Sequence, residues 1–332
     1  MTERLGDIGG RIEGIRQLGA VVNAMRGIAA ARARQARDQL AAVDSYAASI
    51  AAAIGHALAL APPAHPSASR KLALILFCAE QGFAGAFSER VLDAVGADLA
   101  TSAVFLIGTR GASVAAERGV AIGWSGAMPS HSPGVPKLAD GIAEVIYDRI
   151  LRGEIDQVDA VFSQWEPGHG THVERQRLLP FDAARMPYPA DSNPPLITLP
   201  PDVLLRALTA DFVHAQLCKA ALHAFAAENE ARMTAMASAR NQIERRLAEL
   251  QARQRLVRQE EITAEIIELA AGETAGRASG GRKSIPGVVV TPRRSRSDEN
   301  VETALGFGGT RVMRRLGDHL WCGVRIGGNS GR

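Results

Sequence analysis

Aromatic residues, cysteines and long apolar runs are all scarce in this sequence, and each scarcity excludes a class of protein. Only 5% of the 332 residues are aromatic although 46% are apolar, so a core must pack mainly through aliphatic and alanine side chains. Cys78, Cys218 and Cys322 are far apart and form no CxxC pair, which argues against a disulfide framework and favours a reducing compartment. No run approaches the ~20 apolar residues of a membrane span, and the first ten residues, MTERLGDIGG, include no signal-peptide core. We expect a cytoplasmic protein that meets a membrane only through partners.

Glycine and proline are absent from residues 203–271, which are rich in Ala, Leu, Glu, Gln and Arg. These residues lose little on entering a helix, so the stretch predicts one helix of about 100 Å at ~1.5 Å per residue. A helix of that length cannot bury itself in its own globule and needs a second helix beside it. Its predicted seam repeats every seven residues, with one polar member and two residues at the complementary position: Leu222, Asn229, Met236, Ile243, Leu250 and Val257, with Met233 and Leu247.

Residues 8–60 provide the second helix, because they lack proline and repeat apolar residues at the same interval. The predicted seam consists of Ile8, Ile15, Val22, Ala29, Ala36, Val43 and Ile50, joined by Leu18, Met25 and Tyr46. Gly14, Gly19 and Gly27 each cost about 1 kcal/mol in a helix, so we expect the two backbones to approach closely there. The two helices flank the middle of the chain and must therefore run antiparallel. The second is longer, and its seam shifts to Ile262, Ile266 and Leu269, so its tip should stand free and meet a different partner.

The middle of the chain alternates strand and helix patterns, which predicts an α/β layer with a largely parallel sheet. Strands are expected at 72–78, 103–108 and 158–165, a further strand, expected to be antiparallel, at 171–181, and helices at 88–99, 110–118 and 137–152. The fold class is therefore α/β, a long antiparallel coiled coil of N- and C-terminal helices plus a small Rossmann-like domain. The expected domains are 1–61 and 201–275 for the two helices, 70–200 for the α/β domain, and 276–332 for a basic extension.

Glycine-rich segments follow the first two predicted strands, but neither completes a nucleotide motif. EQGFAGAFSE (80–89) contains no GKS, GKT or GxGxxG, so Gly82 and Gly85 are interpreted as a tight strand-to-helix turn rather than a phosphate loop. GTRG (108–111) is interpreted in the same way. His169 and His172, near Glu166 and Glu174, have a spacing that could bind a metal on a helix. The surrounding Pro and Gly favour a loop instead, and no metal or cofactor is expected.

The remaining candidate is a basic stretch of the first helix, which has no acidic residue among its arginines. It is either an ordinary solvated face or a match for an acidic partner surface, and its members are Arg26, Arg32, Arg34 and Arg37. No nucleophile beside a base and no carboxylate pair emerges from the sequence. This absence of visible catalytic chemistry favours a mechanical or scaffolding part.

Several segments resemble the gamma subunit of F-type ATP synthases, the central rotor shaft. The first helix with NAM (23–25), the turn AEQGFAGAF (79–87), LIGTRG (106–111) and RLLPF (177–181) occur in the family's order. The most specific matches are NEARMTAM (229–236) and ELQARQRLVRQEEITAEIIELAAG (249–272). The resemblance covers about residues 1–275.

The resemblance implies a shaft whose coiled coil stands inside a ring of alpha and beta subunits, while its α/β domain lies near the epsilon subunit and the c-subunit ring. By position, Arg258, Gln259, Thr263 and Glu265 would contact loops of the alpha and beta subunits. Met25 and Arg26 would face the acidic segment of the beta subunits. Catalysis would belong to the beta subunits, so this chain would be a non-catalytic subunit on the cytoplasmic face of a bacterial inner membrane.

Two other functions stay open from the residues alone: a cytoplasmic α/β nucleotide-binding module with a coiled-coil dimerisation arm, and a free-standing structural coiled coil. Residues 276–332 carry ten Arg and one Lys against four acidic residues, and their composition predicts disorder, with short strands conceivable at 288–290 and 320–326. Their charge would permit nucleic-acid binding, but no such partner is expected. A shifted reading frame would also produce this Gly- and Arg-rich composition.

Overall fold

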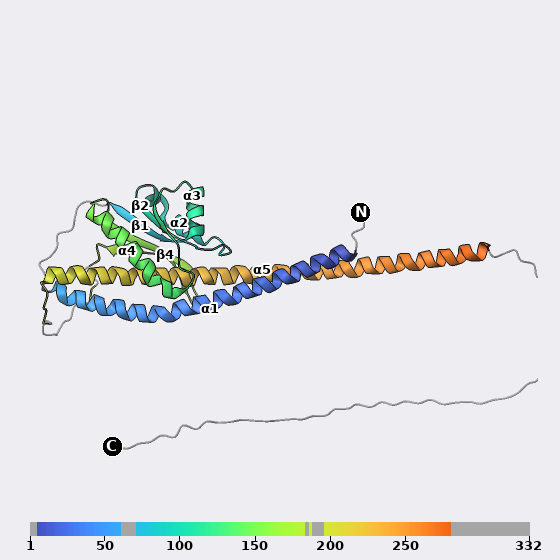
Figure 1. The fold of residues 1–332 in the computed structure, drawn as a ribbon, viewed down its shortest axis with the longest axis horizontal. Coiled ribbons are helices and arrows are strands. Elements are labelled where there is room, and N and C mark those ends of the chain that lie inside the picture. The colour runs from blue at the N-terminus through green and yellow to red at the C-terminus, as the bar shows by residue number, and fades with distance from the viewer. Residues whose placement is uncertain (1–4, 61–70, 183–185, 188–195, 280–332) are drawn as a thin grey trace, which may run out of the picture. The chain divides into compact units, whose positions relative to one another are not determined.

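Two long helices dominate the computed structural model, which describes residues 5–60, 71–182, 186–187 and 196–279 (Figure 1). Helix α1 spans Leu5–Leu58 and helix α5 spans Pro201–Ser279. They lie side by side, as the heptad spacing predicted, and antiparallel, as the order of the elements along the chain predicted. By its internal contacts the chain divides after Ala270 into two units, and the coiled coil and the sheet both belong to the first. No described helix is long and apolar enough to cross a bilayer.

The seam of α5 is the one predicted from its heptads. Leu222, Asn229, Met236 and Leu250 are buried, and Met233, Ile243, Leu247 and Val257 are half-buried. From Arg258 to Glu273 every side chain is exposed, including Ile262 at 50%, Ile266 at 60% and Leu269 at 74%. The prediction of a free apolar tip beyond the paired part of α5 is therefore confirmed.

The seam of α1 was predicted correctly at one of its two positions. Ile8, Val22, Ala29, Ala36 and Ile50 are buried, and Ile15 and Val43 are half-buried. At the complementary position the prediction was wrong, since Leu18 is 52% and Tyr46 51% exposed, and only Met25 is half-buried. The buried members lie four residues after the first set, not three: Ile12, Ala33, Ala47 and Ile54. Two of these four residues are alanines, and the larger side chains of Leu18 and Tyr46 were therefore wrongly taken as seam members.

Close approach of the two backbones was predicted at three glycines of α1 and occurs at one. A Cβ on Gly19 would lie 3.4 Å from Cγ2 of Ile243, so a side chain there would press directly on α5. A Cβ on Gly14 or Gly27 would meet nothing within 4 Å. Those two glycines face away from the seam, and the packing of α5 does not explain them.

Five strands form one sheet in the order β3-β2-β1-β4-β5. The strands are β1 (Leu72–Phe77), β2 (Ala103–Ile107), β3 (Ile122–Gly126), β4 (Gln157–Glu166) and β5 (Gly170–Leu179). All neighbours are parallel except β4 and β5, which confirms the predicted sheet. Strand β3 was missed, because it is a short edge strand with glycine at two of its five positions (IGWSG) and only half-buried side chains on its inner face.

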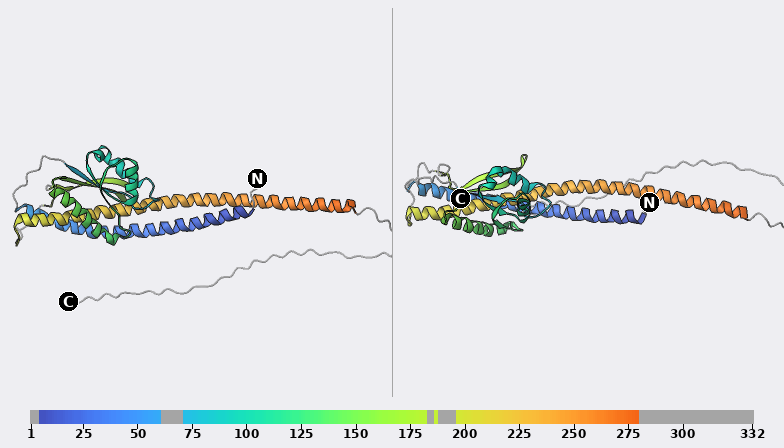
Figure 2. Two further views of the ribbon diagram at one scale, coloured as in Figure 1. Left: turned by 45° about the horizontal axis from the view of Figure 1, so that its top comes forward. Right: turned by 90° about the horizontal axis from the view of Figure 1, so that it is seen from above.

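Each face of the sheet is covered by its own set of helices (Figure 2). Helices α2 (Phe87–Val95) and α3 (Thr109–Glu117) pack on one face, with short 3-10 turns at Gly96–Ala100 and Ser132–Gly134 elsewhere in the domain. Helix α4 (Val135–Leu151) and the first half of α5 pack on the other face. Because α5 lies between the sheet and α1, it is buried on nearly every side from Ala215 to Glu228.

Candidate functional site

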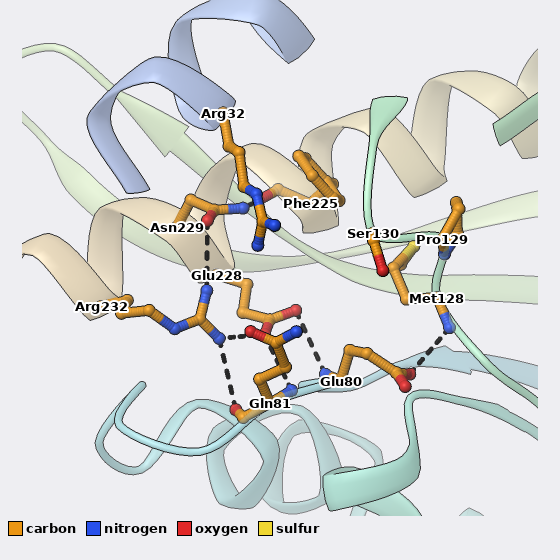
Figure 3. A pocket seen from close by; sticks show the side chains of 10 residues that line it. All are labelled: Arg32, Glu80, Gln81, Met128, Pro129, Ser130, Phe225, Glu228, Asn229 and Arg232. Atoms are coloured by element: carbon orange, nitrogen blue, oxygen red, sulfur yellow. Dashed lines mark hydrogen bonds and ion pairs between the residues drawn. The ribbon is translucent and has the colours of Figure 1, made fainter. Parts of the chain in front are cut away.

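Three polar side chains are buried where α5 passes the carboxyl end of β1. Glu228, Asn229 and Arg232 are only 3%, 2% and 5% exposed, although an uncompensated buried charge is strongly destabilising. Beside them runs the loop that follows β1 and leads to α2. We call these three side chains and the backbone of residues 80–82 the clasp (Figure 3).

The clasp satisfies both charges by hydrogen bonds to the backbone of the loop. The N–H groups of Glu80 and Gln81 donate to the two carboxylate oxygens of Glu228, each at 3.2 Å. The guanidinium of Arg232 donates to the carbonyl oxygens of Gln81 and Gly82, each at 3.3 Å. Figure 3 shows most of these bonds converging on the loop.

Within α5 the members of the clasp also hold one another. Arg232 forms an ion pair with Glu228, one helical turn before it, and donates to Oδ1 of Asn229 at 3.1 Å. The amide of Asn229 donates to the carbonyl oxygen of Phe225 at 2.8 Å. The polar seam position predicted at Asn229 therefore belongs to a buried network that orients the guanidinium.

A second carboxylate, that of Glu80, lies beside the carboxyl ends of the neighbouring strands β2 and β3. It accepts hydrogen bonds from the N–H of Thr109 at 3.0 Å and from the N–H of Met128 at 2.8 Å. Thr109 is the first residue of α3, and helix N-termini at the carboxyl ends of parallel strands are where phosphates bind in nucleotide-binding folds. Here carboxylates of the chain itself accept these N–H groups. The structure therefore favours the interpretation of 80–89 and 108–111 as turns.

The two glycines of the turn after β1 have different backbone conformations. Gly85 has a φ of +61°, a conformation that favours glycine. Gly82 has no positive φ, and its carbonyl oxygen is instead an acceptor in the clasp. Phe83 has a φ of +63° and is 67% exposed, which the sequence did not indicate and which is unusual for a bulky residue.

The arginines of the basic stretch on α1 do not form one exposed face. Arg37 forms an ion pair with Glu230 of α5, and its guanidinium lies 4.8 Å from the ring centre of Trp165 on β4. Arg32 lines a small pocket beside the clasp, together with Glu80 and Glu228. Arg26 and Arg34 are exposed. Only these two are fully available to an acidic partner.

The residues matched to partner contacts fall into two separate groups. Met25 and Arg26 lie on the paired part of α1, half-buried and exposed respectively. The other group, on the free part of α5, is fully exposed and consists of Arg258, Gln259, Thr263 and Glu265. The hydroxyl of Thr263 donates to the carbonyl oxygen of Gln259 at 2.8 Å, within the helix.

Histidines form neither a metal site nor a catalytic pair in the described part of the chain. His169 lies in the turn between β4 and β5, and His172 is 4.0 Å from Glu174 on β5. No group of three or more potential metal ligands occurs among the described residues. The expected loop is thus observed for His169, whereas His172 lies on strand β5.

One cysteine has neighbours that resemble an activated nucleophile, which sequence reasoning missed. Sγ of Cys218 is 3.9 Å from Nδ1 of His214, whose Nε2 is 3.1 Å from Asp140. Burial, with a smaller contribution from Asp140, raises the pKa of Cys218 to about 11. Burial and the charge of Glu228 raise the pKa of Cys78 to about 12. Both cysteines are therefore protonated thiols at neutral pH and poor nucleophiles.

Comparisons with known proteins agree with one another along most of the chain. The family profile described as ATP synthase matches residues 4–275. The chain is 29% identical over 289 residues to the ATP synthase gamma chain of Chlorobium limicola, covering 82% of this chain and 98% of that one. It is 26% identical over 278 residues to the ATP synthase gamma chain of Moorella thermoacetica, with 81% and 98% covered.

Solved structures show the same fold at low sequence identity. A chain of the Euglena gracilis mitochondrial ATP synthase, in a structure of OSCP, F1 and the c-ring, aligns with a TM-score of 0.56 and 12% identity, covering 86% of this chain and 98% of that one. A chain of the rotor of the same synthase aligns with a TM-score of 0.55 and 12% identity, with 78% and 98% covered.

Proposed function

The chain belongs to the gamma-subunit family of F-type ATP synthases, and on that premise we propose that it is the central rotor shaft that couples ion flow to ATP synthesis or hydrolysis by rotation. The observation that carries the proposal is the free part of α5. A helix that continues past its coiled-coil partner with exposed Ile262, Ile266 and Leu269 is suited to enter a surrounding structure. A globular enzyme would gain nothing from it.

We further propose that the chain is not catalytic on its own and that the nucleotide sites belong to the alpha and beta subunits around it. Two observations support this. Glu80 and Glu228 accept the strand-end N–H groups that a nucleotide phosphate would need. Cys78 and Cys218, the two cysteines in the described residues, are held as protonated thiols. These contacts disfavour the alternative of an α/β nucleotide-binding module.

The partner surfaces are assigned by position in the family. The exposed group Arg258, Gln259, Thr263 and Glu265 would contact loops of the alpha and beta subunits. Met25 and Arg26 would face an acidic segment of the beta subunits, and the exposed positive charge of Arg26 suits an acidic surface.

The α/β domain would contact the epsilon subunit and the c-subunit ring, so that the chain reaches the membrane only through partners. In that arrangement the chain would lie on the cytoplasmic face of a bacterial inner membrane. No nucleic acid or cofactor is needed for such a role, and the partner surfaces are all protein. The sequence match over 98% of the length of the gamma chains of Chlorobium limicola and Moorella thermoacetica supports this arrangement.

Affinity purification of the tagged full chain from its own cells tests the proposal. We expect alpha and beta subunits to co-purify with it, and the chain purified alone to bind ATP negligibly in equilibrium dialysis. ATP binding by the isolated chain would favour the nucleotide-binding module. Purification of the chain without any ring subunit, under conditions that keep ATPase activity intact, would favour a free-standing structural coiled coil.

The double substitution Arg258→Ala and Gln259→Ala should separate partner contact from folding. Both side chains are exposed beyond the seam, so the melting temperature of the isolated chain should hardly change, because exposed polar substitutions usually alter stability by less than about 0.5 kcal/mol. Assembly or turnover of the complex should fall. Arg240→Ala, an exposed arginine on the paired part of α5, is the control and should affect neither. A large loss of stability in the double variant would show that the two residues are structural.

A further inference from the structure

A rotor needs a stiff joint between the part that receives torque and the part that delivers it. In this chain the α/β domain is joined to the coiled coil by two covalent connections, near residues 58–72 and 179–201, and by packing. The packing beside the loop after β1 includes three small apolar side chains, Ala79, Ala84 and Ala227, together with Phe87 and the half-buried Trp165. Apolar contact is non-directional, so the small side chains at this end of the interface resist separation of the two parts better than they resist sliding, although the larger core between α5 and the sheet restrains both movements.

We infer that the clasp is this joint: Glu228 and Arg232 fix the angular position of the α/β domain on α5, and thereby make the two parts turn together. This inference rests on the proposed rotor function. Glu228 and Arg232 are positioning residues, because they act through the loop after β1 and not on a substrate.

The geometry of the clasp suits that task. Its four bonds to the loop run in both directions, since Glu228 accepts from two N–H groups and Arg232 donates to two carbonyl oxygens. Hydrogen bonds weaken steeply when their angle changes, so a rotation of the loop about α5 would break acceptor and donor bonds together. The side chains of Arg232 and Glu228 are only 6% and 4% exposed, and the bonds are therefore not weakened by competition with water.

A second polar link reaches the same region from α1. Arg37 contacts Glu230 and Trp165, and so connects α1, α5 and β4. Arg37 is about one-third exposed, however, and Glu230 is 14% exposed. The clasp is the more deeply buried of these two links. Two further contacts join α5 to the domain, from Gln176 of β5 to Gln216 at 2.8 Å and between His214 and the carbonyl oxygen of Pro136 at 3.3 Å, but the clasp holds four backbone groups of one loop.

Exchanging the two charges tests the inference sharply. The variant Glu228→Arg with Arg232→Glu keeps an ion pair one turn apart on α5, but it presents a guanidinium to N–H donors and a carboxylate to carbonyl oxygens. An intrahelical salt bridge would tolerate the exchange, whereas a joint to the loop would not. The matched control is Arg240→Glu with Glu244→Arg, an exposed pair at the same spacing on α5 whose N–O distance is 2.8 Å.

Two measurements on the exchanged variant are decisive. In membrane vesicles carrying the assembled complex, ATP hydrolysis should persist, whereas ion pumping per ATP hydrolysed should fall well below that of the control. In the full chain, the amide hydrogens of Glu80 and Gln81 should exchange about tenfold faster or more, because hydrogen bonds to charged groups are lost. The paired part of the coiled coil should keep its protection, a result that a general loss of folding would not give.

Unchanged pumping per ATP in an assembled exchanged variant would overturn the inference, as would unchanged exchange at residues 80–81. If the exchanged variant does not accumulate, Glu228→Gln takes its place. Its single side-chain oxygen serves both N–H groups less well, and it should show the same two changes to a smaller degree; normal values of both would refute the joint. Absence of ring subunits from the purified chain would contradict the proposed function instead, while amide exchange would still test the clasp.

Discussion

Replacing Leu250 by Asp should open the outer end of the coiled coil and abolish coupled ATP synthesis. Leu250 is 6% exposed and packs in a small cluster with Ile8 and Ile12 of α1. The substitution removes a buried leucine, worth about 1.5–3 kcal/mol, and places a carboxylate in an apolar seam, so the total loss should be several kcal/mol. This cluster is the apolar contact between the first turns of α1 and α5, so those turns should detach while the sheet stays folded.

Amide exchange and circular dichroism of the isolated chain measure this effect. Protection should be lost near residues 8–22, with the α/β domain unaffected. The control is Leu256→Asp, six residues further along the same helix, where the leucine is 56% exposed and stability should change by less than about 0.5 kcal/mol. Normal protection of α1 and normal ATP synthesis in the Leu250 variant would contradict the coiled-coil account.

Replacing Gly111 by Ala should destabilise the α/β domain by about 2–4 kcal/mol. A Cβ at this position of α3 would overlap the Cβ of Cys78 and lie 3.2 Å from its sulfur and 3.4 Å from its Cα. Cys78 follows the central strand β1 and is 1% exposed, so neither side can move without disturbing the core. Helix α3 would have to lift from the sheet, and the hydrogen bonds of Thr109 to Glu80 would weaken.

Chemical denaturation of the full chain measures this second effect. Gly141→Ala in α4 is the matched control, because a Cβ there meets nothing within 4 Å. That change should stabilise by about 0.4–1 kcal/mol, since alanine has less conformational freedom to lose than glycine. Equal stability of the two variants would show that α3 does not pack as tightly on β1 as the structure indicates.

The seven-residue spacing of apolar residues predicted the two long paired helices well, because the contacts of a coiled coil are made by residues at that spacing. Where small residues make the contacts, the spacing of large apolar residues no longer identifies the seam. Ala33 and Ala47 belong to the second seam position, for which Leu18 and Tyr46 were expected. The edge strand β3 was missed for a similar reason, since its glycines carry little strand preference.

The clasp could be foreseen only in part. Asn229 was recognised as a polar residue within the seam, and the buried charges beside it lie in a stretch that is otherwise mostly apolar. Their acceptor and donor groups, however, are backbone atoms of a loop about 150 residues earlier in the chain. No local pattern specifies such a contact, because it depends on how α5 crosses the sheet.

For the residues that follow α5, the predictions made for 276–332 stay predictions. Helix α5 continues to Ser279, and residues 280–332 lie outside the described part of the chain. The expected disorder, the conceivable strands at 288–290 and 320–326, and the origin of the Gly- and Arg-rich composition are therefore untested. Mass spectrometry of the native chain distinguishes a genuine extension, which yields peptides from 311–332, from a mature protein that ends near Ala275.

Rotation of the α/β domain during ATP hydrolysis tests the central claim most directly. A probe can be attached at Glu117→Cys, on the exposed end of α3, in a chain that also carries Cys322→Ser. Cys78 and Cys218 should not react at pH 7, because their pKa values are raised to about 12 and about 11, and only above those values would the reactive thiolates predominate. With the catalytic ring fixed to a surface and ATP supplied, the probe should rotate continuously in one direction. A stationary probe on complexes that hydrolyse ATP at the normal rate would contradict the rotor account.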